Sequence, residues 1–288
     1  MSNNSGFNLE SLMTPALAAT VFAAQESSLY LPGGIIPMES VPAGSTVLQV
    51  PVLAKASAGE KDSAASPFGS DDFTSTAITD STVNIPMSVY ARRTILRDVG
   101  GVNPATVGRQ LGNAVAQSFD QDVTALFQTF VANTAVTGSG TNSALTIDDM
   151  FDAAAELRSN EVMGPLYAIL HPRQTVNIKK TLNTAAFANA DAQNEAMRSG
   201  YVGYVAGIQI FESSFITEDI AAPDHLWEGL VFGEDAMRIG VQKGVDLEIQ
   251  RRAEAVGWDL VANLHAGVGV VDQARGIVVK STGTVVET

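Results

Sequence analysis

The sequence predicts an α+β protein, and three patterns in the chain lead to that prediction. Runs with a period of two at 83–89 and 245–249 indicate β-strands that bury one face. Apolar residues that recur every three to four positions through 103–132 indicate one long helix. Strands and helices do not alternate regularly along the chain, which argues against a doubly wound parallel sheet.

Residues 1–44 are expected to form an amino-terminal arm. Thr14 and Pro15 are suited to open a short helix over 16–24, because proline fits the first turn of a helix. Two prolines and two glycines then interrupt the pattern at 32–37. We expect this remainder to be extended and to become ordered only against a partner. A frayed terminus is the alternative.

Residues 45–97 predict a long β-hairpin arm. β-rich residues at 47–52 and the alternating run at 83–89 flank a stretch rich in Ala, Ser, Gly and Asp. Pro51 and Pro86 support the prediction, because proline cannot donate to a β-ladder and therefore occupies edge strands. A two-stranded arm is marginally stable alone, so we expect it to lie on a neighbouring copy of the chain. An ordinary hairpin with a loose surface loop is the alternative.

The segment 103–132 predicts the long helix. Asn103 can cap it, and Pro104 fits its first position. Gly108 and Gly112 each cost about 1 kcal/mol relative to alanine inside a helix. Close approach of another element would compensate for that cost.

Three shorter helices are expected after the long one. The first is capped by Thr146, and its opening aspartates suit the positive end of the helix dipole. The second follows a turn at His171 and covers about 173–182. The third ends at Gly267 and carries four large residues on one face, which are Trp258, Val261, Leu264 and His265.

Short strands account for much of the rest. A Gly-rich loop is expected at 137–143 and another loop at 184–198. The expected strands, identified from their apolar or alternating character, are 166–170, 202–211, 230–232, 245–249, 277–280 and 284–286.

The composition favours self-association. Hydrophobic residues make up 45% of the 288 residues and charged residues only 17%, below the roughly 25% of ordinary soluble domains. A formal net charge of −14 argues against a protein that grips phosphates. No cysteine is present, so disulfides and thiolate metal sites are excluded. No membrane span or secretion signal is recognisable, and we expect synthesis in the cytoplasm.

Motifs for enzymatic chemistry are missing. No Gly-Lys-Ser/Thr loop, nucleophile elbow or metal-spaced histidine pair occurs. His171, His225 and His265 are interpreted as turn, loop and core residues, respectively. Asp120 and Asp122 are two apart on the long helix, so they point in different directions and form no dyad; we expect a solvated or interface role. The sequence therefore predicts no catalytic residue, metal ligand or cofactor.

Arginines gather after the second strand of the hairpin. Alternation puts Arg93 and Arg97 on one face of a strand and Arg92 on the other. We expect ion pairs with an acidic neighbour at a local symmetry axis, whereas a solvated strand end is the alternative. The complete set of predicted inter-subunit contacts is Pro51, Lys55, Lys61, Pro86, Arg92, Arg93 and Arg97.

The order of these parts resembles the major capsid proteins of tailed bacteriophages with the Hong Kong 97-type fold. The resemblance covers nearly the whole chain. Five stretches carry it: 90–97 (YARRTILR), 118–126 (SFDQDVTAL), 167–173 (YAILHPR), 203–211 (GYVAGIQIF) and 229–237 (GLVFGEDAM).

The resemblance implies a division into named parts. An amino-terminal arm would span 1–44 and an extended hairpin loop 45–97. A spine helix and the start of a peripheral domain would follow at 98–144, and an axial domain at 145–245. Residues 246–288 would return to the peripheral domain.

The resemblance also implies partners. The chain would form hexamers and pentamers that tile an icosahedral shell in the virion, assembled in the host cytoplasm around double-stranded DNA that it contacts non-specifically. A separate scaffolding protein, a portal protein and a decoration protein would be further partners. Some family members crosslink through a lysine of the extended loop, where Lys55 and Lys61 lie here. No acceptor or catalytic acid can be matched, so that chemistry is not carried over.

Two alternatives stay open. One is an encapsulin-like cellular compartment shell, which shares the fold. The other is an acidic cytoplasmic hydrolase or ligand-binding protein, which the missing site motifs disfavour.

Overall fold

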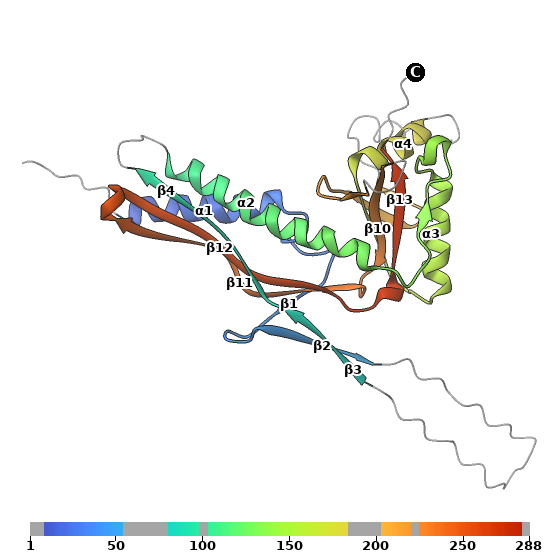
Figure 1. Ribbon diagram of the computed structural model, residues 1–288, viewed down its shortest axis with the longest axis horizontal. Coiled ribbons are helices and arrows are strands. Elements are labelled where there is room, and N and C mark those ends of the chain that lie inside the picture. Colours follow the sequence, from blue (N-terminus) through green and yellow to red (C-terminus); the bar gives the residue numbers. More distant parts are fainter. Residues whose placement is uncertain (1–8, 54–79, 98–102, 184–202, 220–224, 284–288) are drawn as a thin grey trace, which may run out of the picture.

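The computed structural model describes residues 9–53, 80–97, 103–183, 203–219 and 225–283. It contains an elongated body made of two sheets with helices, and a two-stranded hairpin that projects from the middle of the body (Figure 1). Helices and strands are both abundant, and the α+β prediction is confirmed.

A four-stranded sheet forms one end of the body. Its strands, in spatial order, are β1 (Met38–Ser40), β11 (Met237–Arg252), β12 (Gly257–Val270) and β4 (Ser88–Arg97). The strands β11 and β12 pair antiparallel as a long hairpin around the short 3-10 turn η4 (Ala253–Ala255), and β1 is parallel to β11. The ladder of β11 is irregular between Val241 and Asp246, where a bulge interrupts the pairing.

Two helices cover one face of this sheet. The helix α1 (Leu9–Ser27) lies along α2 (Pro104–Ala125), and both contact the sheet (Figure 1). The close approach inferred from Gly108 and Gly112 is confirmed, because a Cβ atom there would lie 2.5 Å from the Ala16 carbonyl oxygen and 2.2 Å from that of Thr20. The two glycines therefore let the helix backbones meet.

The amino-terminal prediction is wrong in its main point. Residues 9–27 form one helix that is longer than expected, and the segment after it is packed into the chain's own core, where Tyr30, Ile35 and Ile36 are buried. The sequence pattern could not reveal this, because the surfaces that cover the segment come from residues distant in the chain.

The long helix is shorter than predicted. Asn103 caps it through a hydrogen bond from the Ala105 amide, and Pro104 opens it, as expected. The α-helix ends at Ala125, and the 3-10 turn η2 (Leu126–Thr129) continues it. The apolar periodicity extends further because Phe127 and Phe130 are buried in the same core.

A seven-stranded sheet forms the other end of the body. Its spatial order is β5 (Val136–Thr137), β13 (Gly276–Thr282), β10 (Leu226–Gly233), β6 (Leu166–Leu170), β8 (Ile208–Glu212) and β7 (Tyr204–Val205), with β9 (Glu218–Asp219) also paired to β10. The helices α3 (Ile147–Ser159) and α4 (Pro172–Asn183) contribute to the core on one face. Thr146 caps α3 in a capping box with Asp149, so that prediction is confirmed.

Two other predictions for the second half of the chain are wrong. The expected single strand at 202–211 is a pair, β7 and β8, joined by a tight turn at Ala206 and Gly207. The expected helix around Trp258 is the strand β12. Alternate residues of β12 are buried on the face toward the helices, so a period of two and not of 3.6 governs this segment. The expected strand at 284–286 and the loop at 184–198 lie outside the described residues.

The main core lies between the helix pair and both sheets. Phe119, Phe127 and Phe130 contribute to it, together with Leu264 of β12 and Phe232 of β10. Since one cluster spans both ends of the body, the two sheets are joined by continuous packing. Among the described helices, none is both long and apolar enough to cross a membrane.

Candidate assembly interface: the hairpin root and its surroundings

The hairpin consists of β2 (Val47–Leu53) and β3 (Asp80–Pro86), which pair antiparallel from Val47 opposite Pro86 to Leu53 opposite Asp80. The antiparallel pairing predicted for this segment is therefore present. Pro51 and Pro86 are both exposed on strands that have no second neighbour in the described chain. The arm thus has free edges, as the prolines indicated.

The base of the hairpin packs on its own chain. Val41, Leu48, Val50 and Ile85 form a small buried cluster, which we call the hairpin root. The expectation that the ribbon 47–89 finds its stabilising contacts only on other copies is wrong for this part. Leu48, Val50 and Ile85, the three members on the hairpin strands, anchor these strands on the sheet behind them, because burial of each contributes about 1.5–3 kcal/mol.

Hydrogen bonds fasten the chain on both sides of the root. The Met87 amide donates to the Thr46 carbonyl oxygen at 2.9 Å, which closes the base of the hairpin. The side-chain amide of Gln242, at the bulge of β11, donates to the carbonyl oxygens of Ser45 (2.8 Å) and Pro42 (3.2 Å). The hairpin is therefore tied to β11 as well as continuous with β4.

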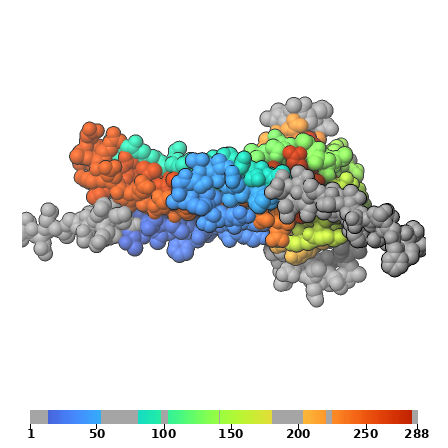
Figure 2. Space-filling view, turned by 90° about the horizontal axis from the view of Figure 1, so that it is seen from below, coloured from blue at the N-terminus to red at the C-terminus, as the bar shows by residue number. Residues whose placement is uncertain are grey.

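Glycines line the sheet where the root crosses it. Gly240 of β11 and Gly267 of β12 are direct cross-strand partners, and Gly269 lies two residues further on the same face. This face is opposite to the one that α1 and α2 cover, because the intervening residues Ile239 and Ala266 point into the main core. Seen from below, the amino-terminal segment that includes β2 covers the middle of the body (Figure 2).

The predicted contact residues are only partly described. Lys55 and Lys61 lie in 54–79, outside the described residues. Arg92, Arg93 and Arg97 lie on β4, in the four-stranded sheet of the body and not on the projecting arm.

Arg93 has a partner within its own chain. Its Nε donates to Asp259 Oδ1 at 2.7 Å, and its Nη2 forms a second bond to the other carboxylate oxygen. Within the described part of the chain, the side chains of Arg92 and Arg97 make no ion pair or hydrogen bond. These two exposed cations are thus better candidates for inter-subunit contacts than Arg93.

The expectation for Asp120 is wrong, because this carboxylate is neither solvated nor placed for an interface. It is buried, and it accepts hydrogen bonds from Ser28 Oγ at 2.6 Å and the Leu29 amide at 2.9 Å. Burial raises its pKa from 3.8 to about 6, against the two hydrogen bonds, which act to lower the pKa. Asp120 holds the turn after α1 onto α2. Asp122 points elsewhere, as predicted, and accepts from the Tyr90 hydroxyl at 2.8 Å.

The histidines do not assemble a reactive site. His171 stacks on Trp227 with ring centroids 3.7 Å apart, and burial together with nearby Arg173 lowers its pKa. His225 lies in a loop, with its Nδ1 3.8 Å from Glu218 Oε1. His265 is half-buried and lies on a strand instead of the predicted helix. No group of three potential metal ligands occurs among the residues that the structure describes.

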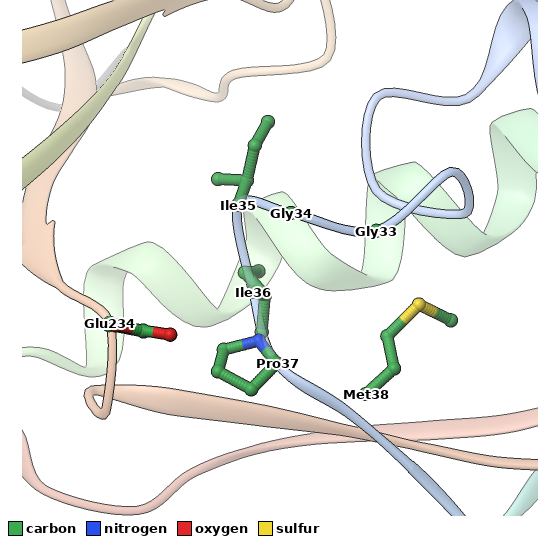
Figure 3. Close-up of a pocket in the computed structure, with 7 residues that line it drawn as sticks. All are labelled: Gly33, Gly34, Ile35, Ile36, Pro37, Met38 and Glu234. Atoms are coloured by element: carbon green, nitrogen blue, oxygen red, sulfur yellow. The ribbon is translucent and has the colours of Figure 1, made fainter. Parts of the chain in front are cut away.

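A shallow hollow lies beside the segment that enters β1. It encloses about 180 Å³ and is lined by residues 33–38 together with Glu234 (Figure 3). Ile35, Ile36, Pro37 and Met38 give it an apolar wall, and Glu234 is its single ionisable group. The residues that line the hollow therefore bring no pair of reactive side chains together.

The chain matches the model of one protein family over most of its length. The model of the family described as phage capsid protein matches residues 89–279, well over half of the chain. The chain therefore belongs to the phage capsid protein family, a class of bacteriophage structural proteins. No curated protein matches it.

Solved structures identify the fold as that of Hong Kong 97-type major capsid proteins, as predicted. The capsid of Ralstonia phage GP4 has a TM-score of 0.67 at 10% identity, covering 88% of this chain and 89% of that one. The capsid of cyanophage P-SCSP1u has a TM-score of 0.64 at 20% identity, covering 87% of each chain. An encapsulin complex from Synechococcus elongatus PCC 7942 has a TM-score of 0.55 at 11% identity, covering 88% of each chain.

Family and fold point to a structural role in the virion, not to catalysis. Sequence reasoning found the hairpin and the arginine strand from local periodicity. It did not find the glycine surface under the root. Gly267 was expected only to end a helix, and Gly269 had no expected role, because the function of both glycines depends on which element crosses them.

Proposed function

We propose that this chain forms hexamers and pentamers that build an icosahedral shell around double-stranded DNA. One observation carries the proposal: the hairpin leaves the body with only its root packed, while its strands β2 and β3 keep free edges. A two-stranded ribbon of this kind is marginal alone. Neighbouring copies in a closed lattice would supply its missing contacts, and many weak contacts closing together make a stable shell.

The contact residues in this assembly are Pro51 and Pro86 on the hairpin, Lys55 and Lys61 in the sequence between β2 and β3, and the arginines of β4. Arg92 and Arg97 would pair with acidic side chains of another copy, for which a chain with net charge −14 offers many sites. Arg93 would contribute to that interface while bound to Asp259.

The test is electron microscopy of the purified chain, produced alone and together with its scaffolding protein. We expect closed particles of uniform diameter with the wild type. Charge reversal at the two exposed arginines (Arg92→Glu with Arg97→Glu) should prevent particle formation while the circular dichroism of the monomer stays unchanged. Normal particles from that variant would refute the assigned contacts, and a wild type that stays monomeric under all assembly conditions would refute the function.

Packaged DNA is proposed to touch the shell without sequence preference. The acidic net charge limits tight binding to phosphates. Binding measured at several salt concentrations should be weak and equal for unrelated duplexes. Nanomolar, sequence-selective binding would contradict this part of the proposal. Portal and decoration proteins would be additional partners, and assembly would take place in the host cytoplasm.

An encapsulin-like compartment is the second candidate function. The similarity to an encapsulin complex favours it, and the fold alone does not separate the two. Particles purified from cells that express the neighbouring genes distinguish them. DNA inside the particles supports the capsid, whereas one co-purifying protein enclosed in them supports the compartment.

A further inference from the structure

We propose that Gly240, Gly267 and Gly269 are positioning residues that set the direction in which the hairpin leaves the body. This proposal rests on the proposed shell function, because the direction of the arm matters only if the arm must meet another copy. It concerns residues of the sheet that lie directly under the hairpin root.

The hairpin root lies closer to the sheet than ordinary side chains would allow. A Cβ atom at Gly267 would lie 2.2 Å from the Pro86 carbonyl oxygen, and one at Gly269 would lie 2.7 Å from Ile85 Cγ1. A Cβ atom at Gly240 would lie 2.7 Å from the Met87 methyl group and 3.2 Å from Leu48 Cδ2. All four distances are below ordinary contact, so the root rests directly on the sheet backbone.

The chain enters and leaves the hairpin through short connections to the body. β3 ends at Pro86 and β4 begins at Ser88, so a single residue, Met87, joins β3 to a strand of the body, whereas residues 41–46 join β2 to β1. β4 is held by pairing with β12 along its whole length. The tilt of the hairpin is therefore set at Met87, at the segment before β2 that Gln242 binds, and at the surface beneath the root.

A small rotation at the root moves the far end of the hairpin by several ångströms. The seven residues of β3 extend about 23 Å at 3.3 Å per residue. A tilt of about 10° at the root would displace the far end of the strand by roughly 4 Å at that length. A contact made by a β-strand edge or a side chain on another copy does not tolerate such a displacement, because hydrogen bonds need separations near 3 Å.

The clash at Gly267 cannot be relieved by a rotamer change. The group that a new methyl would meet is a backbone carbonyl, so the root itself must lift or rotate. Gly244 offers a matched control on β11, because nothing lies within 4 Å of its Cβ position. Gly244→Ala adds the same methyl to the same sheet without touching the hairpin.

The experiment measures the direction of the arm and its consequence together. The chain has no cysteine, so Thr82→Cys on β3 and Gln117→Cys on α2 allow two spin labels at exposed positions. Pulsed electron paramagnetic resonance measures the distribution of distances between the two labels in the unassembled chain. Electron microscopy of the unlabelled chain shows whether particles form and what diameter they have.

We expect Gly267→Ala to shift or broaden the distribution of label distances by several ångströms. The same variant should form no particles or particles of a different diameter. Gly244→Ala should match the wild type in both measurements. An unchanged distance in Gly267→Ala, or a changed distance with normal particles, would overturn the proposal. If the wild type never forms particles, the proposed shell function is refuted. The distance measurement still tests separately whether Gly267 sets the direction of the hairpin.

A compensating pair guards against a variant that simply fails to fold. Gly240→Ala meets only side chains, most closely the flexible end of Met87 and then Val41 Cγ2 at 3.1 Å and Leu48 Cδ2 at 3.2 Å, and so should disturb the root less than Gly267→Ala. Adding Met87→Ala removes the methyl group that the new Cβ would meet. We expect the double variant to recover the wild-type distance and particles. If Gly240→Ala folds but has an altered arm direction, and Met87→Ala does not restore it, then the contact between the new Cβ and Met87 is not the cause of the change.

Discussion

The two faces of the four-stranded sheet are covered in the same manner but not to the same depth. On one face, Gly108 and Gly112 let α1 approach α2, and on the other, Gly267 and Gly269 let the hairpin root approach β12. In both places a missing side chain brings two backbones together. The helix face, however, belongs to a core that spans both sheets, whereas the root is a cluster of four buried side chains.

The difference separates stability from direction. The helix face holds the body together, so changes there should lower the stability of the whole chain. The root adds little burial, so changes there should leave the body folded and alter only the arm. Substitutions at four positions test this separation, beginning with the largest expected effect. The positions are Phe119, Asp120, Ile85 and Arg93.

Phe119→Ala should destabilise the whole chain. Phe119 is fully buried, and its ring meets that of Tyr90 from β4 edge to face at 5.6 Å between centroids. Removal of such a ring costs about 3–5 kcal/mol. Urea unfolding of the unassembled chain should show this loss, with exposed Gln117→Ala as the matched control on the same helix. A loss below 1 kcal/mol would mean that the helix face is not the main source of stability.

Asp120 should make the helix face respond to pH. Its pKa is raised from 3.8 to about 6 in the fold, so the folded chain binds a proton more tightly than the unfolded chain between these values. Stability attributable to this group is therefore present below about pH 4 and lost as the pH rises through 6. The change is at most about 3 kcal/mol, since one pKa unit corresponds to 1.36 kcal/mol.

The measurement compares the free energy of unfolding of the wild type and Asp120→Asn at pH 7 and pH 4.5. Other carboxylates titrate in both proteins and cancel in the difference. We expect the wild type to gain stability relative to Asp120→Asn at the lower pH. A relative loss on acidification would show that the hydrogen bonds from Ser28 and Leu29 outweigh burial.

Ile85→Val should act locally. It removes one methylene from the hairpin root, and Ile239→Val removes the same group from the main core. Each change costs about 0.5–1.5 kcal/mol. Hydrogen exchange should accelerate only in β2 and β3 for Ile85→Val, whereas Ile239→Val should accelerate exchange throughout the body. Exchange that accelerates everywhere in both variants would show that the root and the body unfold as one unit.

Arg93→Ala should have the smallest effect on the unassembled chain. Its ion pair with Asp259 lies at the surface, where such pairs contribute little because water and salt screen them. The melting temperature should stay within experimental error of the wild type. A clear decrease would show that β4 depends on this pair to stay bound to β12.

Local signals in the sequence were sufficient for elements that carry their own boundaries. Asn103 and Pro104 marked the start of α2, and Thr146 marked that of α3. β12 was mistaken for a helix because Trp258, Val261 and Leu264 fit a helical spacing. Its true alternation runs partly through alanines, which give a weak hydrophobic signal.

The features that depend on distant partners could not be predicted. The role of Asp120 requires Ser28 and Leu29, about ninety residues earlier in the chain. Likewise, the function of Gly267 becomes visible only when Pro86 is seen above it. One sequence contains no information on which segments meet, so buried polar groups and glycine contacts between distant elements remain hidden until the fold is known.

The single-residue junction at Met87 also has a mechanical consequence. Tension applied to the arm would pass through β3 into β4, whose ten residues pair with β12 from Ser88 to Arg97. A pull along the axis of a strand loads all of its ladder bonds in shear at once, instead of opening them one after another. We therefore expect force spectroscopy on the arm to record rupture in one high-force step.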